Sequence, residues 1–356
     1  MANQVPTTAQ VSASSFCAVI LAQPGHSICE PRRLTPARHV LDFDHAVAPI
    51  LMINRVMFST RRLLLKFILL GLLLSMAAMS VGAPAQARTL KPAIGLTWQP
   101  AKLVRGSPVL FQVSAPKAQS VTGEWMGHKI KFFRYENGTR WYALAGIPVE
   151  TKAGNYDLSI SEALSRGPVQ LTKKIKIATA KYPRIAAHVA KKFTEPNPEQ
   201  MKQISADKNV KQAVLATESA QKLWSGGFES PVPSPVSDVF GTERVFNGEV
   251  QSRHLGLDFA APAGTSVHAI NSGTVILAQD LYFEGGFIVI DHGQGLLSLY
   301  LHLSDFRVKA GDPVAHADII GVSGSSGRAT GPHLHLAVRW QGVYVDPAVL
   351  LKLNIP

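Results

Sequence analysis

Short runs in which apolar and polar residues alternate make up much of the chain from about residue 94 onward. Two examples are Val109–Val113 and Lys129–Phe133, and such runs are bounded by turn signals such as Gly106-Ser107-Pro108 and Ala153-Gly154-Asn155. A period of two that is broken by Gly, Pro and Asn is typical of half-buried strands. Turn signals spaced roughly 8–12 residues apart favour a small sandwich. The pattern therefore predicts an N-terminal β-sandwich over residues 88–180.

Residues 236–356 also carry strand patterns and almost no helical ones. The predicted strands include Thr274–Ala278, Phe287–Asp291, Leu296–Leu301 and Leu334–Trp340, with glycines between them. Apolar runs of this length, bounded by turn residues, indicate buried strands. We expect a C-terminal domain built on an antiparallel sheet that closes partly into a barrel, so that the fold class is mainly β.

A short helical connector is predicted between these regions, over residues 181–235. The sequence Asn197-Pro198-Glu199-Gln200 has the pattern of a helix start, with an N-cap Asn, Pro at the first helical position and Gln at the third. The Ala-, Lys-, Gln- and Glu-rich stretch that follows predicts a helix to about Trp224, ended by Gly226-Gly227. A Pro-rich linker then leads into the last domain.

Residues 57–87 have the composition of a secretory signal peptide. Arg61 and Arg62 precede the strongly apolar stretch Leu63–Met79, and Ala85-Gln86-Ala87 fits the small-residue cleavage rule. The sequence therefore predicts an exported, periplasmic or cell-envelope protein whose mature chain begins at Arg88. An uncleaved signal that anchors the protein transiently to the membrane is the alternative, although Lys66 leaves an apolar core of only about 13 residues.

Residues 1–56 precede this signal and show no clear periodicity. One interpretation is a mis-assigned start, with translation beginning at Met52 or Met57. The other is a long, disordered leader.

Charge is distributed unevenly along the chain, whose formal net charge is +12. Residues 88–228 hold about 22 basic against about 10 acidic residues, whereas residues 229–356 hold about 7 against 12. A basic half predicts a contact with an anionic partner, for which cell-wall polymer, an anionic lipid surface and nucleic acid are candidates, and the alternative is a basic face that is merely solvated. We expect the anionic cell-envelope surface to be the partner. No interleaved aromatic and basic pattern supports nucleic-acid binding.

Cysteine chemistry is excluded from the predicted mature chain. The two cysteines, Cys17 and Cys29, lie upstream of the predicted signal. Any metal site in the mature chain must therefore use His and carboxylate ligands.

Two short histidine motifs in the last domain have the spacing of a metal or catalytic site. His254 and Asp258 stand four residues apart around Gly256, and His333 and His335 stand two apart around Leu334. On extended segments, residues separated by two or four positions share one face. Each motif alone is common, but their joint presence in a domain without cysteine predicts one chemical site. Tyr300 precedes His302 by two residues and is expected on the same face, as a wall of the cleft.

The stretch from about Phe240 to Pro347 resembles the catalytic domain of the M23 (lysostaphin/LytM-type) metallopeptidases. The matching segments include Phe240-Gly241, the HxGxD motif of His254–Asp258, Ala260–Thr265, Ile290–Gly293, Leu299–Ser304, Val308–Asp312, the Thr330–His335 segment with its GPHLH motif, and Val345–Pro347. Residues 88–180 resemble the immunoglobulin-like domain that often precedes this peptidase unit. The resemblance covers about a third of the chain, and the HxGxD and GPHLH motifs are its most specific parts.

This resemblance implies a zinc-dependent endopeptidase that cleaves peptide cross-links between the stem peptides of bacterial peptidoglycan. It implies that His254, Asp258 and His335 bind Zn²⁺ and that His302 and His333 are catalytic histidines outside the ligand set. Which of the two accepts a proton, and which stabilises the oxyanion, stays open. Arg253 and Arg328 flank the predicted site and are candidate contacts for substrate carboxylates.

Other functions remain as alternatives. Degenerate LytM-type modules, which lack one or more of these five residues, bind the wall and activate other hydrolases without catalysis; all five are present here. A biotinyl- or lipoyl-type carrier domain is disfavoured because the hairpin lysine motif such domains need does not occur.

Overall fold

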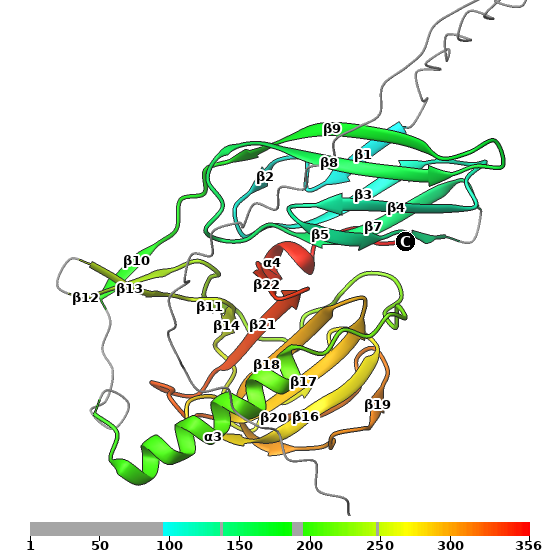
Figure 1. Cartoon of the computed structure of the whole chain (residues 1–356). Coiled ribbons are helices and arrows are strands. Elements are labelled where there is room, and N and C mark those ends of the chain that lie inside the picture. Colours follow the sequence, from blue (N-terminus) through cyan, green and yellow to red (C-terminus); the bar gives the residue numbers. More distant parts are fainter. Residues whose placement is uncertain (1–94, 136–137, 187–194, 247–248) are drawn as a thin grey trace, which may run out of the picture. The chain divides into compact units, whose positions relative to one another are not determined.

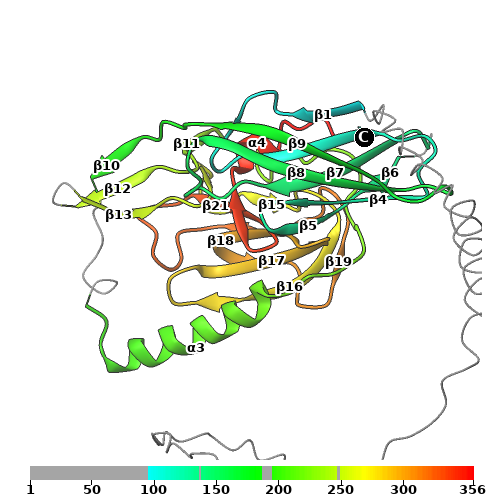
Figure 2. The ribbon, with the colours of Figure 1, turned by 45° about the horizontal axis from the view of Figure 1, so that its top comes forward.

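The computed structural model describes residues 95–356, apart from residues 136–137, 187–194 and 247–248. The predicted leader (1–56) and signal peptide (57–87) lie outside the described residues. The described chain is mainly β, as predicted, and Figures 1 and 2 show its strands and helices from two directions.

Two sheets form the N-terminal β-region. The four-stranded sheet has the order β1-β3-β7-β6 and the five-stranded sheet the order β2-β9-β8-β4-β5. Their bounds are β1 Gly95–Gln99, β2 Leu103–Val104, β3 Pro108–Ser114, β4 Ser120–Trp125, β5 His128–Lys131, β6 Phe133–Arg134, β7 Arg140–Gly146, β8 Gly154–Ala163 and β9 Val169–Ala178. Phe111 and Trp125, one from each sheet, pack edge to face with ring centroids 5.4 Å apart. The alternation in the sequence thus produces a sandwich with a shared apolar core.

One predicted strand of this region divides in the structure. The run Lys129–Phe133 supplies both β5 and β6, which belong to different sheets. Phe132, buried between them, is where the chain passes from one sheet to the other. The sequence pattern could not reveal this because inward-facing positions of both sheets are apolar.

A curled antiparallel sheet forms the C-terminal region. Its main path is β11-β14-β21-β18-β17-β16-β19, with β15, β20 and β22 attached. The bounds are β11 Val236–Asp238, β14 Leu257–Phe259, β15 Ser266–His268, β16 Gly273–Leu281, β17 Gly285–Gly293, β18 Leu296–Phe306, β19 Pro313–Val314, β20 Ile319–Ser323, β21 Leu334–Trp340 and β22 Val343–Val345. All four predicted strands occur, and β21 matches its prediction at both ends.

Helix α3 (Pro198–Leu215) begins as predicted but ends earlier. Asn197 accepts a hydrogen bond from Gln200 N, and the Gln200 side chain accepts one from Asn197 N, which completes a capping box. The predicted continuation to Trp224 is wrong. After Leu215 the chain instead joins the end of β17, where Leu223 N donates to His292 O at 2.8 Å. Backbone pairing with a sheet therefore overrides helix propensity there.

A small three-stranded sheet is separate from the curled one. It contains β10 (Arg184–Ala186), β12 (Glu243–Phe246) and β13 (Glu249–Arg253), in the order β10-β12-β13. The strand β10 pairs with β12 in parallel, so the predicted connector contributes a strand as well as a helix. Glu243 forms ion pairs with Arg184 at 2.7 Å and Arg253 at 2.6 Å, which join all three strands.

The described residues fall within one compact unit, Ala87–Pro356. A continuous hydrophobic cluster includes core residues of both the sandwich and the curled sheet. The short helix α4 (Pro347–Leu350) follows β22, with Asp346 as its N-cap. No helix among the described residues is long and apolar enough to cross a membrane.

Candidate metal centre

The three predicted metal ligands lie together in the structure. His335 on β21 stands opposite Asp258 on β14 in the antiparallel register, and His254 follows the end of β13. Asp258 Oδ1 is 2.8 Å from His335 Nδ1 and 3.0 Å from His254 Nε2, and the two ring nitrogens are 3.0 Å apart. One carboxylate oxygen and two imidazole nitrogens therefore converge on a single point.

The route by which His254 reaches Asp258 differs from the expected one. We expected one extended segment, but residues 254–256 lie between β13 and β14 and belong to neither strand. The chain bends at Gly256, between the two strands, and this bend brings the two side chains together. The spacing was informative, although strand alternation was the wrong reason for it.

The tautomer of His254 is set by a backbone carbonyl. Nδ1 lies 2.9 Å from Val239 O, to which it donates, and this leaves the Nε2 lone pair directed at the cluster. Asp238 holds the Val239 turn, since its Oδ1 accepts from Thr242 Oγ1 at 2.7 Å and from Val239 N at 2.9 Å. Such support of a ligating histidine by an outer shell is common in metal sites.

Charge interactions at the cluster favour a bound cation. Burial alone raises the pKa of Asp258, but hydrogen bonds from His254 and His335 outweigh it and hold that pKa far below its usual range. Burial likewise opposes a charge on His254, yet the Asp258 carboxylate raises the pKa of His254 overall. Burial lowers the pKa of His335. The three ligand atoms lie within 4.8 Å of one another, so that one cation could bind all three.

Gly256 provides the space that the His335 ring occupies. A β-carbon on residue 256 would lie 2.5 Å from His335 Cε1 and 2.6 Å from Leu336 O. Both distances are too short for any side chain. The glycine in the HxGxD motif therefore permits the close approach of one ligand to the segment that carries the other two.

The two predicted catalytic histidines lie beside this cluster. The ring centroid of His302 is 4.7 Å from that of His333 and 6.2 Å from that of His335. Nδ1 of His302 donates to Ser326 O at 2.9 Å, and Nδ1 of His333 donates to Gly331 O at 2.8 Å. In both rings Nε2 is then the nitrogen that can accept a proton.

His302 occupies an unusual backbone position. Its φ is 67°, in the left-handed region, and the pairing of β17 with β18 shifts register between Ile288 and Gly286, where His302 lies. Its amide donates to Glu284 O at 2.9 Å. Burial, followed by the neighbouring His333 and His335, lowers the pKa of His302 to about 4. The ring is therefore neutral and able to accept a proton through the neutral pH range.

Tyr300 does not line the cleft, and the expectation that it shares a face with His302 is wrong. Its side chain is fully buried, and its hydroxyl accepts from Ile270 N at 2.9 Å and from Ser298 Oγ at 3.1 Å. The bulge at His302 breaks the alternation on which the expectation rested.

The two flanking arginines differ in their surroundings. Arg253 is paired with the buried carboxylate of Glu243 at 2.6 Å. Arg328 is exposed, and its guanidinium lies 5.0 Å from the centre of the Phe283 ring. A role for either in contacting substrate stays a prediction.

Sequence reasoning missed the residues that support the site through their backbone. Val239, Glu284 and Ser326 each supply a carbonyl to one of the predicted site histidines. Their side-chain types carry no signal for that function. A glycine- and serine-rich segment around Ser326 was the only hint in the sequence.

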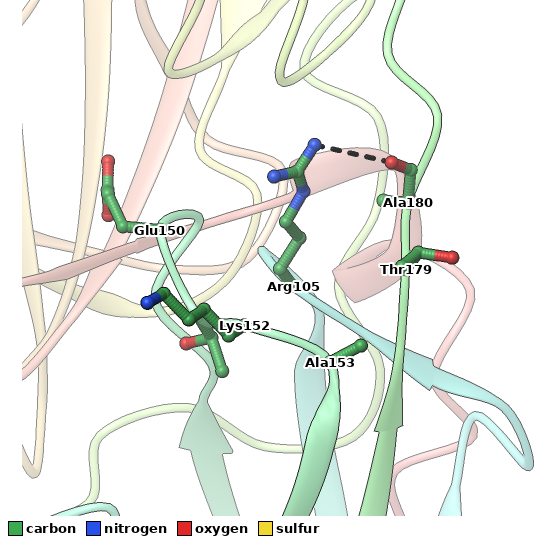
Figure 3. Close-up of a pocket in the computed structure, with 7 residues that line it drawn as sticks. Arg105, Glu150, Lys152, Ala153, Thr179 and Ala180 are labelled. Atoms are coloured by element: carbon green, nitrogen blue, oxygen red, sulfur yellow. Dashed lines mark hydrogen bonds between the residues drawn. The ribbon is translucent and has the colours of Figure 1, made fainter.

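A cavity of about 210 Å³ in the N-terminal β-region is separate from this site. It is lined by Arg105, Glu150, Thr151, Lys152, Ala153, Thr179 and Ala180. Arg105 donates to Ala180 O at 3.3 Å, as Figure 3 shows. No histidine lines this cavity, so its residues do not have the donor set found at the metal centre.

Comparison with known proteins agrees with this geometry. Residues 252–347, which include all five predicted site residues, match peptidase family M23. A crystal structure of a putative peptidase M23 from Pseudomonas aeruginosa is 31% identical, with a TM-score of 0.54, and the match covers 70% of this chain and 95% of that chain. The chain belongs to peptidase family M23. The predicted M23 relationship and the peptidase class are thereby confirmed.

Curated relatives match over about a third of the chain. Peptidoglycan DD-endopeptidase ShyA of Vibrio cholerae is 42% identical over 103 residues, which is 29% of this chain and 23% of ShyA. DD-carboxypeptidase/endopeptidase Mpg of Neisseria meningitidis is 38% identical over 124 residues, which is 34% of this chain and 29% of Mpg. The matched segments thus span less than a third of these relatives.

Proposed function

We propose that this chain is a zinc-dependent endopeptidase that cleaves peptide cross-links of bacterial peptidoglycan. The observation that carries the proposal is the convergence of His254 Nε2, Asp258 Oδ1 and His335 Nδ1 beside the rings of His302 and His333. Two curated relatives that match this chain are named as peptidoglycan DD-endopeptidase and as DD-carboxypeptidase/endopeptidase.

The donor set fits Zn²⁺. Two imidazole nitrogens and one carboxylate oxygen are a common catalytic zinc set that leaves a coordination position open. His254, Asp258 and His335 would hold the ion. When bound, Zn²⁺ activates a water for attack and polarises the scissile carbonyl.

The histidines outside the ligand set would move the protons. Because its pKa is lowered to about 4, His302 is neutral near pH 7 and can accept a proton from the attacking water at Nε2. The His333 ring lies 4.7 Å from the His302 ring, centre to centre, and would donate a hydrogen bond to the oxyanion or a proton to the leaving amine. The reverse assignment of the two histidines is equally compatible with the geometry.

Hydrolysis of purified peptidoglycan tests the proposal. The zinc-loaded protein should convert cross-linked muropeptide dimers into monomers, each cut adding the mass of one water. A chelator should stop the reaction and added Zn²⁺ should restore it. Release of free terminal amino acid without loss of dimers would instead indicate a carboxypeptidase. A protein that holds no zinc and leaves the dimers intact would favour the inactive, activating LytM-type module.

Export to the cell envelope is part of the same proposal, because the substrate lies there. It is supported by the composition of residues 57–87 and by the names of the peptidoglycan-acting relatives. Mass analysis of the protein recovered from the envelope fraction should give a chain that begins at Arg88. A full-length protein in that fraction would support anchoring by an uncleaved signal.

A further inference from the structure

The turn between β16 and β17 contacts the catalytic region on its inner side. The carbonyl of Glu284 accepts from His302 N at 2.9 Å, and the carbonyl of Phe283 accepts from Arg328 N at 2.8 Å. Just beyond the turn, Gly286 N donates to Ser326 Oγ at 2.9 Å. Since Ser326 O also accepts from the His302 ring, this turn and the Ser326 segment together hold both the backbone and the imidazole of His302.

Helix α3 contacts the same turn from the other side. Asp207 Oδ2 accepts from Tyr282 N at 2.7 Å, and Lys211 Nζ lies 2.5 Å from Glu284 Oε1. Both views show α3 running along the sheet beside β16 (Figures 1 and 2). The helix therefore contacts the backbone amide of Tyr282 and the carboxylate of Glu284. The backbone carbonyl of Glu284 in turn binds the amide of His302.

The polar contacts of α3 are partly buried, and Asp207 is their most buried member. Asp207 is 5% exposed, and Gln203 Nε2 donates to its second carboxylate oxygen at 2.7 Å. The helix packs on the sheet through only three partly buried apolar residues, Val210, Val214 and Leu215, all at or C-terminal to residue 210. A buried carboxylate without partners would be strongly unfavourable, so Asp207 fixes where the helix meets the turn.

The backbone of His302 needs such external support. A non-glycine residue at φ 67° is strained and persists only where its surroundings determine it. Its own polar contacts in the described residues are with the carbonyls of Glu284 and Ser326, while its neighbours Leu301 and Leu303 pair with adjacent strands. A displacement of the turn would therefore allow His302 to relax out of its position beside His333.

We propose that Asp207 and Lys211 are positioning residues, and that α3 holds the β16–β17 turn so that the Glu284 carbonyl keeps His302 in its catalytic position. The inference rests on the proposed function, because it assigns His302 a role in proton transfer. It extends that function to a helix that touches none of the metal ligands in the described contacts and that precedes the residues matched to the M23 family.

The first test compares Lys211→Met with Lys208→Met in the zinc-loaded protein. Lys208 is exposed on the same helix, so its substitution makes the same change in charge and side chain without touching the turn. We expect Lys211→Met to lower kcat by about 10- to 100-fold, since small misplacements of reacting groups have effects of this size. KM and zinc content should stay within about twofold of the wild type, since ligands and substrate contacts are intact. An unchanged kcat for Lys211→Met, even with a lower melting temperature, would overturn the inference.

Two further variants separate positioning from general destabilisation. Asp207→Asn keeps an oxygen that can accept from Tyr282 N and should retain most activity, whereas Asp207→Ala should behave like Lys211→Met. The double variant Lys211→Glu with Glu284→Lys restores an ion pair of reversed sign and should recover kcat relative to either single change. Equal activity of Asp207→Asn and Asp207→Ala, or no recovery in the double variant, would contradict the proposed coupling.

Residue-resolved hydrogen exchange supplies a readout that does not depend on hydrolysis. Lys211→Met should speed exchange of the His302 amide, which bonds to Glu284 O, while amides in the middle of β17 keep wild-type rates. If Lys211→Met speeds exchange of the His302 amide but the wild-type protein cleaves no peptidoglycan, the proposed function is refuted and the coupling between α3 and His302 stands. An active wild type whose His302 amide is unaffected by Lys211→Met would refute the coupling alone.

Discussion

Gly256 and the imidazole of His335 approach so closely that a β-carbon at residue 256 would lie 2.5 Å from His335 Cε1. The backbone at Gly256 does not have a positive φ, so an alanine would be opposed by this contact rather than by its own conformation. We predict that Gly256→Ala displaces His335 and weakens Zn²⁺ binding by at least 10- to 100-fold, the range seen when the support of a ligand is disturbed.

Gly331→Ala is the matched control for this prediction. Gly331 lies beside His333, also lacks a positive φ, and would meet no atom within 4 Å if it carried a β-carbon. Competition with a chromophoric chelator should show wild-type zinc affinity for Gly331→Ala and a large loss for Gly256→Ala. Equal affinities in the two variants would mean that the close approach does not matter for the ion.

His335 and His302 should separate metal binding from catalysis. His335→Ala removes one of three converging donors and should abolish both zinc binding and hydrolysis. His302→Ala should keep the zinc and lose hydrolysis, because His302 hydrogen-bonds to Ser326 and Glu284 rather than to the ligand set. Zinc content and muropeptide release are measured on the same preparations. Full hydrolysis by His302→Ala would remove it from the proposed mechanism.

The sequence predicted the strands of this fold better than the β-bulges that interrupt them. Strand β21 was predicted to the residue because Leu334–Trp340 is an apolar run with a buried alternate face. The bulge at His302 left no trace in the pattern, since both Tyr300 and His302 are buried. The placement of Tyr300 was wrong for that reason. Bulges depend on register between strands that are distant in the sequence.

The candidate site, too, could be predicted only in part from the sequence. Side chains that carry chemistry were found from residue type and spacing, whereas the groups that orient them are backbone carbonyls of Val239, Glu284 and Ser326. Any residue other than the one observed would present the same carbonyl, so residue type alone is silent about them. Helix α3 was predicted from its cap, but its contact with the turn beside His302 depends on tertiary packing.

The exposed face of the five-stranded sheet offers a test of wall binding by the basic half. Lys131 and Lys176 point outward beside Thr122 and Asn155, which are uncharged, so their charges are available to a partner. We predict that Lys131→Gln with Lys176→Gln lowers retention on purified cell wall at low salt, and that the difference disappears at high salt. Deletion of residues 88–180 would be a poorer test, because these residues share a compact unit with the peptidase region.

The control for charge is Lys202→Gln with Lys208→Gln, two exposed lysines on α3. This pair changes net charge equally but lies outside the β-sandwich. Pelleting with wall fragments over a range of salt concentrations measures retention. If both pairs lower retention alike, net charge rather than the sandwich face attracts the wall.

His292 connects the stability of the curled sheet to pH. Its ring is fully buried, with Nδ1 2.7 Å from Ser272 O and Nε2 2.7 Å from Ser298 Oγ. Burial lowers the pKa of His292 to about 4, against an ordinary value of 6.5. Between these two values the unfolded chain binds a proton that the folded chain does not. Stability is therefore full above pH 6.5 and falls as the pH decreases toward 4.

We predict that His292 removes about 3 kcal/mol from the free energy of unfolding between pH 6.5 and 4. Urea unfolding of the zinc-loaded protein at intervals from pH 7 to pH 5 should show a steep loss for the wild type and a shallower one for His292→Gln. The loss of Zn²⁺ on acidification affects both proteins, so the difference between their slopes isolates the buried ring. Parallel slopes for the wild type and His292→Gln would show that this imidazole is not the group that senses acid.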